Sequence, residues 1–176
     1  MLFRSHDQPA TVVAPGVTSY QDAHLQHDPA RAEVWRAIAG YLARWIPQDA
    51  AVVEIGAGYC DWINQVRSGG QRVAVDIWRG VAQHAGPGVT ATTLDISRDL
   101  ETLGRATFDV VLASNVLEHF EPETAARVAA GAYALLKPGG RLLVVQPNFK
   151  LAWRNYFDDY THRAIFTDVS LPAMLR

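Results

Sequence analysis

The 176-residue chain lacks several features that point to particular classes of protein. It has one cysteine, Cys60, which excludes an internal disulfide framework and is typical of a reducing compartment. It has no run of lysine and arginine and a formal net charge of −2, so a broad electrostatic grip on nucleic acid is not expected. No apolar run approaches the ~20 residues that span a bilayer, and the N-terminus lacks the apolar stretch of a signal peptide. We therefore expect a cytoplasmic protein that binds neither nucleic acid nor a membrane.

The remaining composition is that of an ordinary globular domain, with 49% hydrophobic and 19% charged residues. The length suits one domain with a substantial core. Residues 1–27 show no sustained periodicity, and we interpret them as an N-terminal arm that precedes a folded domain of residues 28–176. His6, His24 and His27 in this arm match no metal-ligand spacing, so no metal site is predicted.

Short apolar runs alternate with helical segments along the rest of the chain. A first helix is expected from Asp28 and Pro29 to Pro47, with an apolar stripe of Val34, Ile38, Leu42 and Trp45. The expected strands are residues 51–55, 72–77, 89–96, 108–114 and 141–147, and the expected helices between them are residues 60–70, 78–86, 97–104 and 123–136. This alternation predicts an α/β fold: a Rossmann-like, doubly wound, mostly parallel sheet of about five strands with helices on both faces.

Polar residues stand at or just after the ends of the five expected strands. They are Glu54, Asp76, Asp95, Asn115 and Asn148. Ligands of such open sheets bind outside the carboxyl ends of the strands. We therefore expect these side chains to meet at one rim that forms a binding site.

The loop "GAG" after the first strand favours a cofactor that contains adenosine. Gly56 and Gly58 let backbone N–H groups approach a ligand closely, and Asp76 stands where a carboxylate accepts hydrogen bonds from ribose hydroxyls. The dinucleotide-binding fingerprint, G-x-G-x-x-G/A, requires glycine or alanine at position 61, where this chain has Asp61. Glu54 and Asp61 would also repel a pyrophosphate, so a cationic, phosphate-free compound such as S-adenosylmethionine is favoured over NAD.

Five ordered motifs carry a resemblance to a known family. They are "VVEIGAGYC", "VAVDI", "LDIS", "FDVVLASNVLEHF" and "LLKPGGRLLVVQPN". With them, residues 28–175 resemble the class I S-adenosylmethionine-dependent methyltransferases. "EIGAGYCDW" and "QPNF" further resemble a bacterial, type 11-like subgroup that is found with polysaccharide and glycoconjugate biosynthesis.

The resemblance implies a role for each residue of the rim. It implies cofactor contacts by Glu54 at the start of the loop, Gly56, Ala57 and Gly58 along the methionine, Asp76 at the ribose, Ile77 on the adenine, Asp95 and Ile96 beside it, and Asn115 at the methyl group. Cys60 departs from the family, which has a third glycine there. The family also continues with two further strands, so the chain is expected to lack this C-terminal pair and to expose its fifth strand to a second copy or a partner chain.

The resemblance implies methyl transfer to a small-molecule acceptor, such as a sugar or another biosynthetic intermediate, with S-adenosylhomocysteine as the product. Asn115 and His119 are the expected catalytic residues, with His119 as the base because imidazole titrates near neutral pH. His162 and Asp159 are further candidates for the base. The alternative is a non-catalytic module that binds S-adenosylmethionine or a partner through an incomplete sheet.

Overall fold

Five parallel strands form one sheet in the computed structural model, which describes residues 29–176. The strands are β1 (Val52–Ile55), β2 (Arg72–Asp76), β3 (Val89–Thr93), β4 (Phe108–Ser114) and β5 (Leu136–Val145). Their order across the sheet is β3-β2-β1-β4-β5, which confirms the predicted Rossmann-like architecture. The predicted arm of residues 1–27, with its three histidines, lies outside the described residues.

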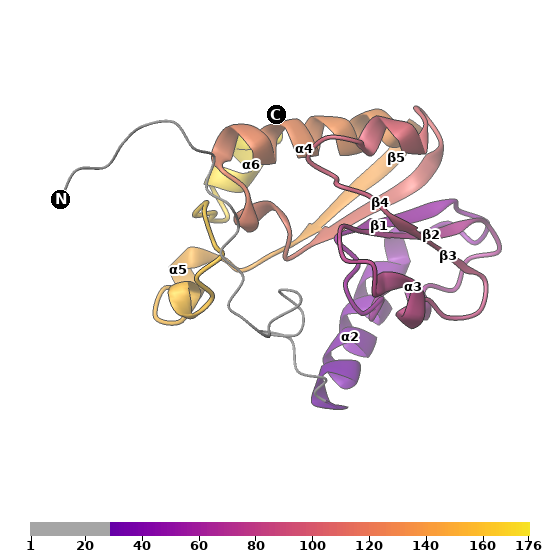
Figure 1. Ribbon diagram of the computed structural model, residues 1–176, viewed down its shortest axis with the longest axis horizontal. Coiled ribbons are helices and arrows are strands. Elements are labelled where there is room, and N and C mark those ends of the chain that lie inside the picture. Colours follow the sequence, from indigo (N-terminus) through magenta and orange to yellow (C-terminus); the bar gives the residue numbers. More distant parts are fainter. Residues whose placement is uncertain (1–28) are drawn as a thin grey trace.

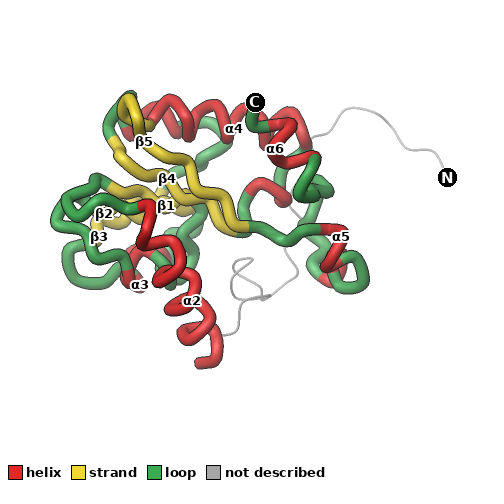
Figure 2. The backbone as a smooth tube through the Cα atoms, turned by 180° about the vertical axis from the view of Figure 1, so that it is seen from behind, coloured by secondary structure: helices red, strands yellow, loops and turns green. Residues whose placement is uncertain are grey.

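Helices cover both faces of this sheet. The α-helices are α2 (Pro29–Leu42), α3 (Val81–His84), α4 (Pro122–Leu135), α5 (Phe149–Ala152) and α6 (Ser170–Met174). The 3₁₀ turns are η1 (Ala43–Trp45), η2 (Ile63–Gln65), η3 (Leu100–Leu103), η4 (Leu117–His119) and η5 (Tyr156–Asp158). Figure 1 shows α4 on one side of the sheet and α2 and α3 on the other. Seen from behind, α5 lies beyond the carboxyl ends of β4 and β5 (Figure 2). No helix within residues 29–176 combines the length and apolarity needed to cross a bilayer.

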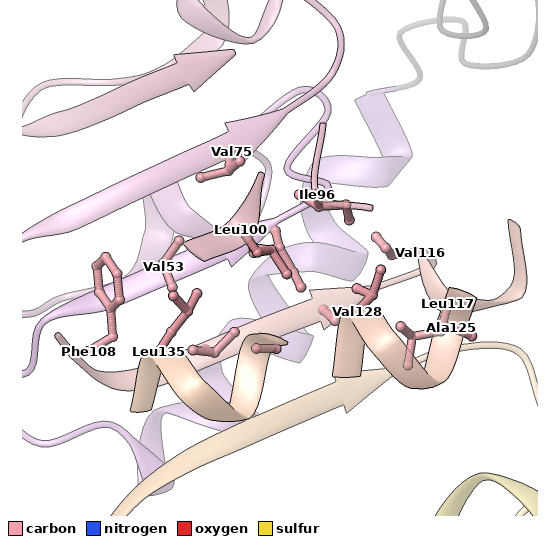
Figure 3. Close-up of a cluster of buried hydrophobic side chains, with 14 of the residues drawn as sticks. Val53, Val75, Ile96, Leu100, Phe108, Val116, Leu117, Ala125, Val128 and Leu135 are labelled. Atoms are coloured by element: carbon pink, nitrogen blue, oxygen red, sulfur yellow. The ribbon is translucent and has the colours of Figure 1, made fainter. Parts of the chain in front are cut away.

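Each face of the sheet contributes to its own hydrophobic core. One core lies between the sheet and α4, where Val53 and Val75 pack with Val128 and Leu135 of the helix (Figure 3). The opposite core includes Val52, Ala74, Leu112, Trp35 and Trp62. Neighbouring strand residues are therefore buried on opposite faces, which is why the strands appear in the sequence as continuous apolar runs.

The first helix faces the sheet with most of the predicted stripe, since Ile38, Leu42 and Trp45 pack in the core, but Val34 does not. Val34 is 58% exposed, whereas the next residue, Trp35, is 6% exposed and lies in the core. Leu42 is buried as expected. The larger indole occupies the inward position at the start of the helix, so the prediction for Val34 is wrong.

Two predicted short helices form only single 3₁₀ turns. Within residues 60–70, η2 covers Ile63–Gln65, and within residues 97–104, η3 covers Leu100–Leu103. Cys60 has a φ of +58°, which a right-handed helix cannot include. Ser68 and Gly69 instead bond to the loop before β1, with Gly69 N–H donating to the Gln48 carbonyl at 2.7 Å. Local turn bonds hold residues 60–66, and the end of the segment is tied to a neighbouring loop instead of continuing as a helix.

The strand β5 begins five residues earlier than predicted. Gly139 has the expected left-handed conformation, with a φ of +80°, but the segment around it pairs with β4. The register shifts there, because Phe108 pairs with Leu136 and Val110 pairs with Arg141. Within residues 29–176, β5 has one neighbouring strand and forms an edge of the sheet. An apolar groove of about 620 Å³ lies between α2 and the end of β5.

Candidate functional site

The loop after β1 has a conformation that requires glycine. Gly56 has a φ of +70° and Gly58 a φ of +49°. A Cβ atom at Gly56 would lie 2.2 Å from Cγ2 of Val116, so a side chain there would collide with the segment that follows β4. Ala57 N–H donates to the Val75 carbonyl at 2.9 Å, which fixes the loop to the adjacent strand β2. The loop is thus held at the rim with its backbone open to close approach.

Asp76 at the end of β2 organises this loop. Its Oδ2 accepts a hydrogen bond from Gly58 N–H at 2.8 Å, and its Oδ1 accepts one from Trp78 N–H at 2.8 Å. The residue is 6% exposed, and burial raises the pKa of its carboxyl while the backbone hydrogen bonds oppose that rise. A carboxylate oxygen accepts more than one hydrogen bond, so both oxygens retain capacity for ligand hydroxyls.

Glu54 is buried in β1 and carries less charge than the sequence suggests. It is 3% exposed, and its Oε2 accepts a hydrogen bond from Ile63 N–H at 3.0 Å. Burial raises the pKa of this carboxyl to about 8, and the nearby carboxylates of Asp61 and Asp76 add to the effect. At neutral pH the ligand-free protein therefore keeps Glu54 largely protonated.

Asp61, the second acid beside the loop, has a cationic partner. Its Oδ2 lies 2.6 Å from Nε of Arg31 on α2, in an ion pair that is partly shielded from solvent. The expectation of two unpaired negative charges beside the loop is therefore wrong, because Glu54 is protonated and Asp61 is paired. Charge repulsion alone discriminates less against a pyrophosphate than the sequence suggests.

Cys60 has no features of a nucleophile. The side chain is fully buried, and burial raises the pKa of its thiol to about 12. A thiol with that pKa carries almost no thiolate at neutral pH. The residue therefore fills space behind the loop in the place of the family's third glycine.

The ends of β2 and β3 present different surfaces. Ile77 exposes 67% of its surface, whereas Ile96 exposes 9% and lies in the core beneath α4. Asp95 accepts hydrogen bonds at Oδ1 from the N–H of Ser97 at 2.9 Å and from its hydroxyl at 2.6 Å. Ile77 is thus the apolar surface that this part of the rim offers to a ligand.

Three aromatic rings beside Ile77 were not predicted as part of the site. The Trp78 ring packs edge-on to Tyr59 at 5.3 Å and stacks with His84 at 5.4 Å between centroids. The Tyr59 and His84 rings are also in edge contact at 4.7 Å. The available signal was their sequence position, because Tyr59 follows Gly58 directly and Trp78 lies two residues after Asp76.

The predicted catalytic residues follow β4. Asn115 is exposed, has a φ of +49°, and donates its N–H to the Val145 carbonyl at 2.8 Å. His119 is half-buried, and its Nδ1 lies 2.8 Å from Oγ1 of Thr161. Burial lowers the pKa of His119, while the carboxylate of Asp159 opposes that change, so the imidazole is neutral at physiological pH.

The further candidates for the base gather around His119. The rings of His119 and His162 lie 5.0 Å apart between centroids, and Asp159 Oδ2 lies 3.8 Å from His162 Nε2. Sequence reasoning missed Glu118, which is fully buried beside these residues. Asn148, the fifth rim residue, caps α5 and accepts a hydrogen bond from Lys150 N–H.

Fold and rim together define an α/β domain that is built to hold a cofactor at the carboxyl ends of its strands. The chain belongs to the methyltransferase domain family, whose profile matches residues 53–142, about half of the chain. That span contains the loop, Asp76, Asp95 and Asn115. A comparison with curated proteins finds no match.

Solved structures share this fold. An S-adenosylmethionine-dependent methyltransferase from Archaeoglobus fulgidus superposes with a TM-score of 0.73 at 20% identity, over 82% of this chain and 66% of that one. The 1,6-didemethyltoxoflavin-N1-methyltransferase of Burkholderia thailandensis, solved with its acceptor and S-adenosylhomocysteine, has a TM-score of 0.59 and 26% identity over 85% of this chain and 67% of that one. An O-methyltransferase family protein from the same species is covered over 50% of its length, so the chain spans about half to two thirds of these proteins. The comparisons support S-adenosylmethionine as the cofactor of the rim.

Proposed function

We propose that the protein transfers a methyl group from S-adenosylmethionine to a small-molecule acceptor. The observation that carries this proposal is the match of residues 53–142 to a methyltransferase domain, on a chain whose glycine loop is fixed by Asp76 at 2.8 Å. Bound S-adenosylmethionine supplies a methyl carbon that its sulfonium already activates. The protein then has to hold the acceptor in line with the methyl carbon and sulfur, and positioning of this kind lowers a barrier by up to about 7–11 kcal/mol.

Different strand ends of the rim bind different parts of the cofactor. The loop of Gly56, Ala57 and Gly58, which Glu54 precedes, receives the methionine part, and Asp76 receives the ribose hydroxyls. The exposed Ile77 packs on the adenine, and Asp95 with Ile96 borders it. A cationic ligand next to Glu54 favours the ionised carboxylate, so cofactor binding is expected to release its proton.

Asn115 and His119 act at the methyl group. Asn115 lies at the end of β4 with its side chain exposed, where it can orient the methionine end. In its neutral form His119 accepts the proton of an acceptor hydroxyl. Bound S-adenosylmethionine would then donate its methyl group to that oxygen as its carbon–sulfur bond breaks, with S-adenosylhomocysteine as the product.

The segment after β5 is the proposed acceptor side of the site. It exposes the aromatic rings of Trp153, Phe157 and Tyr160, which are 57%, 57% and 70% exposed. Rings of this kind pack against flat or ring-shaped ligands. The toxoflavin-precursor enzyme of Burkholderia acts on a small heterocycle, which supports an acceptor of this size class, whether a sugar or another biosynthetic intermediate.

Ile77 offers a test of cofactor binding that leaves folding intact. Ile77→Ala removes apolar surface that is exposed without ligand, so stability should change by less than about 0.5 kcal/mol. Loss of adenine contact should weaken S-adenosylmethionine binding about tenfold in isothermal titration, the equivalent of about 1.4 kcal/mol. Val169→Ala, which changes a side chain with 64% exposure, serves as the control and should bind like wild type. Equal affinity of all three proteins would contradict the proposed adenine position.

Catalysis is tested separately with labelled S-adenosylmethionine and a panel of sugar, heterocyclic and phenolic acceptors. Transfer that His119→Ala reduces at least about 100-fold supports the proposed base. Binding of the cofactor without transfer to any acceptor would instead favour the alternative, a non-catalytic module that binds S-adenosylmethionine.

A further inference from the structure

Glu118, His119 and His162 form a cluster of metal-binding side chains beside the rim. Each offers one ligand atom, and these atoms all lie within 4.8 Å of one another. Three ligands of one divalent ion at about 2.0–2.2 Å lie roughly 3.3–3.8 Å apart, so side-chain shifts of about an ångström would close the cluster around an ion. Glu118 and His119 are neighbours in the sequence, whereas His162 comes from the segment after β5, and they meet because the backbone holds these two segments together.

Backbone hydrogen bonds provide that connection. The carbonyl of Glu118 accepts hydrogen bonds from Arg163 N–H at 2.7 Å and Ala164 N–H at 3.0 Å. Within the segment after β5, the Tyr156 hydroxyl donates to the Ala164 carbonyl at 2.5 Å and so braces the turn that carries His162. The segment that carries His162 is therefore fixed against η4, and the cluster is part of the folded structure.

Glu118 is the independent indication of a ligand. Its side chain is fully buried, and among the described residues neither carboxyl oxygen has a hydrogen-bond partner. Burial raises the pKa of this carboxyl to about 7 against the opposing effect of the nearby backbone N–H groups of Glu118 and Val116, neither of which meets hydrogen-bond geometry at the carboxyl oxygens. Buried carboxylates without hydrogen bonds are costly, and in proteins they are paired or bind metal ions.

The two histidines are oriented as metal ligands usually are. His162 Nδ1 lies 2.6 Å from the carbonyl of Tyr156, so Nδ1 donates the proton and Nε2 carries the lone pair of the neutral ring. The Thr161 hydroxyl donates to Asp159 Oδ1 at 2.6 Å and so accepts from His119 Nδ1, 2.8 Å away. Ligating histidines typically donate their other ring N–H to such an oxygen, which fixes the tautomer and the orientation of the ring.

We propose that Glu118, His119 and His162 bind one divalent transition-metal ion, of the class of Zn²⁺, Co²⁺ or Mn²⁺. Two imidazoles and one carboxylate favour these ions over Mg²⁺ and Ca²⁺, which prefer oxygen ligands. Three protein ligands leave at least one coordination position of the ion open. Resting on the proposed function, that position would take the acceptor hydroxyl, and the metal would lower its pKa so that its proton passes to solvent. His119 would then serve as a metal ligand instead of the proton acceptor proposed above.

Metal binding is measured directly on the full chain after dialysis against a chelator. Titration with Co²⁺, followed by visible absorption and calorimetry, should show one ion bound per chain. Glu118→Gln and His162→Ala should each weaken this binding at least about tenfold. His84→Ala changes a histidine outside the cluster and should bind Co²⁺ like wild type.

Two variants are used so that misfolding of one leaves the other informative, and circular dichroism checks both. Absence of binding, or binding that neither variant weakens, would overturn the proposed site. Cofactor titration in parallel tests the proposed function independently of the metal. Co²⁺ binding at these residues with methyl transfer that a chelator leaves unchanged would support the site and overturn its catalytic role.

Discussion

Protonation of Glu54 should make the stability of this protein depend on pH in an unusual direction. The unfolded chain ionises this carboxyl near pH 4.5, whereas the folded protein holds the proton up to about pH 8. Between these values the folded state binds more protons than the unfolded state, so the free energy of unfolding falls as the pH rises. The contribution is fully present below about pH 4.5 and is lost progressively up to about pH 8.

The size of the effect follows from the shift in pKa. One pKa unit corresponds to 1.36 kcal/mol, so the two pKa values give a loss of about 3–4 kcal/mol between pH 5 and pH 8. That is a large part of the ~5–15 kcal/mol that stabilises a typical domain. Urea denaturation at pH 5, 6, 7 and 8, followed by tryptophan fluorescence, measures it.

Glu54→Gln isolates this contribution. The amide oxygen can keep the hydrogen bond from Ile63 N–H, but the side chain no longer titrates. Other buried acids, including Glu118 and Asp76, titrate in both proteins and cancel in the difference. The variant should become more stable than wild type, relative to pH 5, by about 3–4 kcal/mol at pH 8. Glu101→Gln, an exposed change in η3, should show no such difference.

Parallel pH profiles of wild type and Glu54→Gln would refute this reasoning, because Glu54 would then be ionised in the fold. Cofactor binding gives a second readout of the same proton. If a cationic ligand displaces it, calorimetry of S-adenosylmethionine binding in buffers of different ionisation enthalpy should show proton release, and Glu54→Gln should show less.

Three further predictions concern the loop and the core. Gly56→Ala should lower the urea midpoint and abolish cofactor binding in calorimetry, because its Cβ would lie 2.2 Å from Val116 Cγ2 in a left-handed backbone; wild-type behaviour would contradict the loop geometry. Leu112→Ala, at a fully buried position in the middle of β4, should cost about 2–5 kcal/mol in urea denaturation, and a cost below about 1 kcal/mol would argue against a packed core there. Cys60 should react with a thiol reagent in urea but not in the native protein, and rapid native modification would show that the thiol is accessible.

The strands could be predicted because burial on both faces of the sheet gives each strand a short, continuous apolar run in the sequence. Both faces of β1 and β4 pack against helices, so neighbouring residues such as Val52 and Val53 are both apolar. The chain also places polar residues directly after the strands, and parallel pairing then brings Glu54, Asp76 and Asn115 to one rim. The position of these residues at one rim was therefore predictable from the sequence, whereas their contacts with the cofactor stay predictions.

Long-range contacts decide the features that sequence reasoning missed. The helix expected from Cys60 is replaced by a 3₁₀ turn because the residue is left-handed and the following segment bonds to the loop around Gln48. Trp35 instead of Val34 packs in the core beneath the sheet, and the spacing of apolar residues in the helix does not decide between these two neighbours. Glu118 is buried where its backbone carbonyl accepts a hydrogen bond from the N–H of Arg163, and no local sequence pattern predicts a contact over that distance.

The protein offsets the desolvation cost of its buried glutamates differently. This difference between Glu54 and Glu118 argues for a ligand at Glu118. Glu54 is protonated and accepts a backbone hydrogen bond from Ile63, which compensates part of its desolvation. Glu118 is also buried, yet neither of its oxygens has a hydrogen bond of ordinary geometry among the described residues. Buried polar groups normally have hydrogen-bond partners, and exceptions to this rule usually occur at functional sites. Because ligand atoms of two histidines lie within 4.8 Å of its carboxyl, a bound cation would remove the penalty at Glu118, the acid that is left without a hydrogen bond of ordinary geometry among residues 29–176.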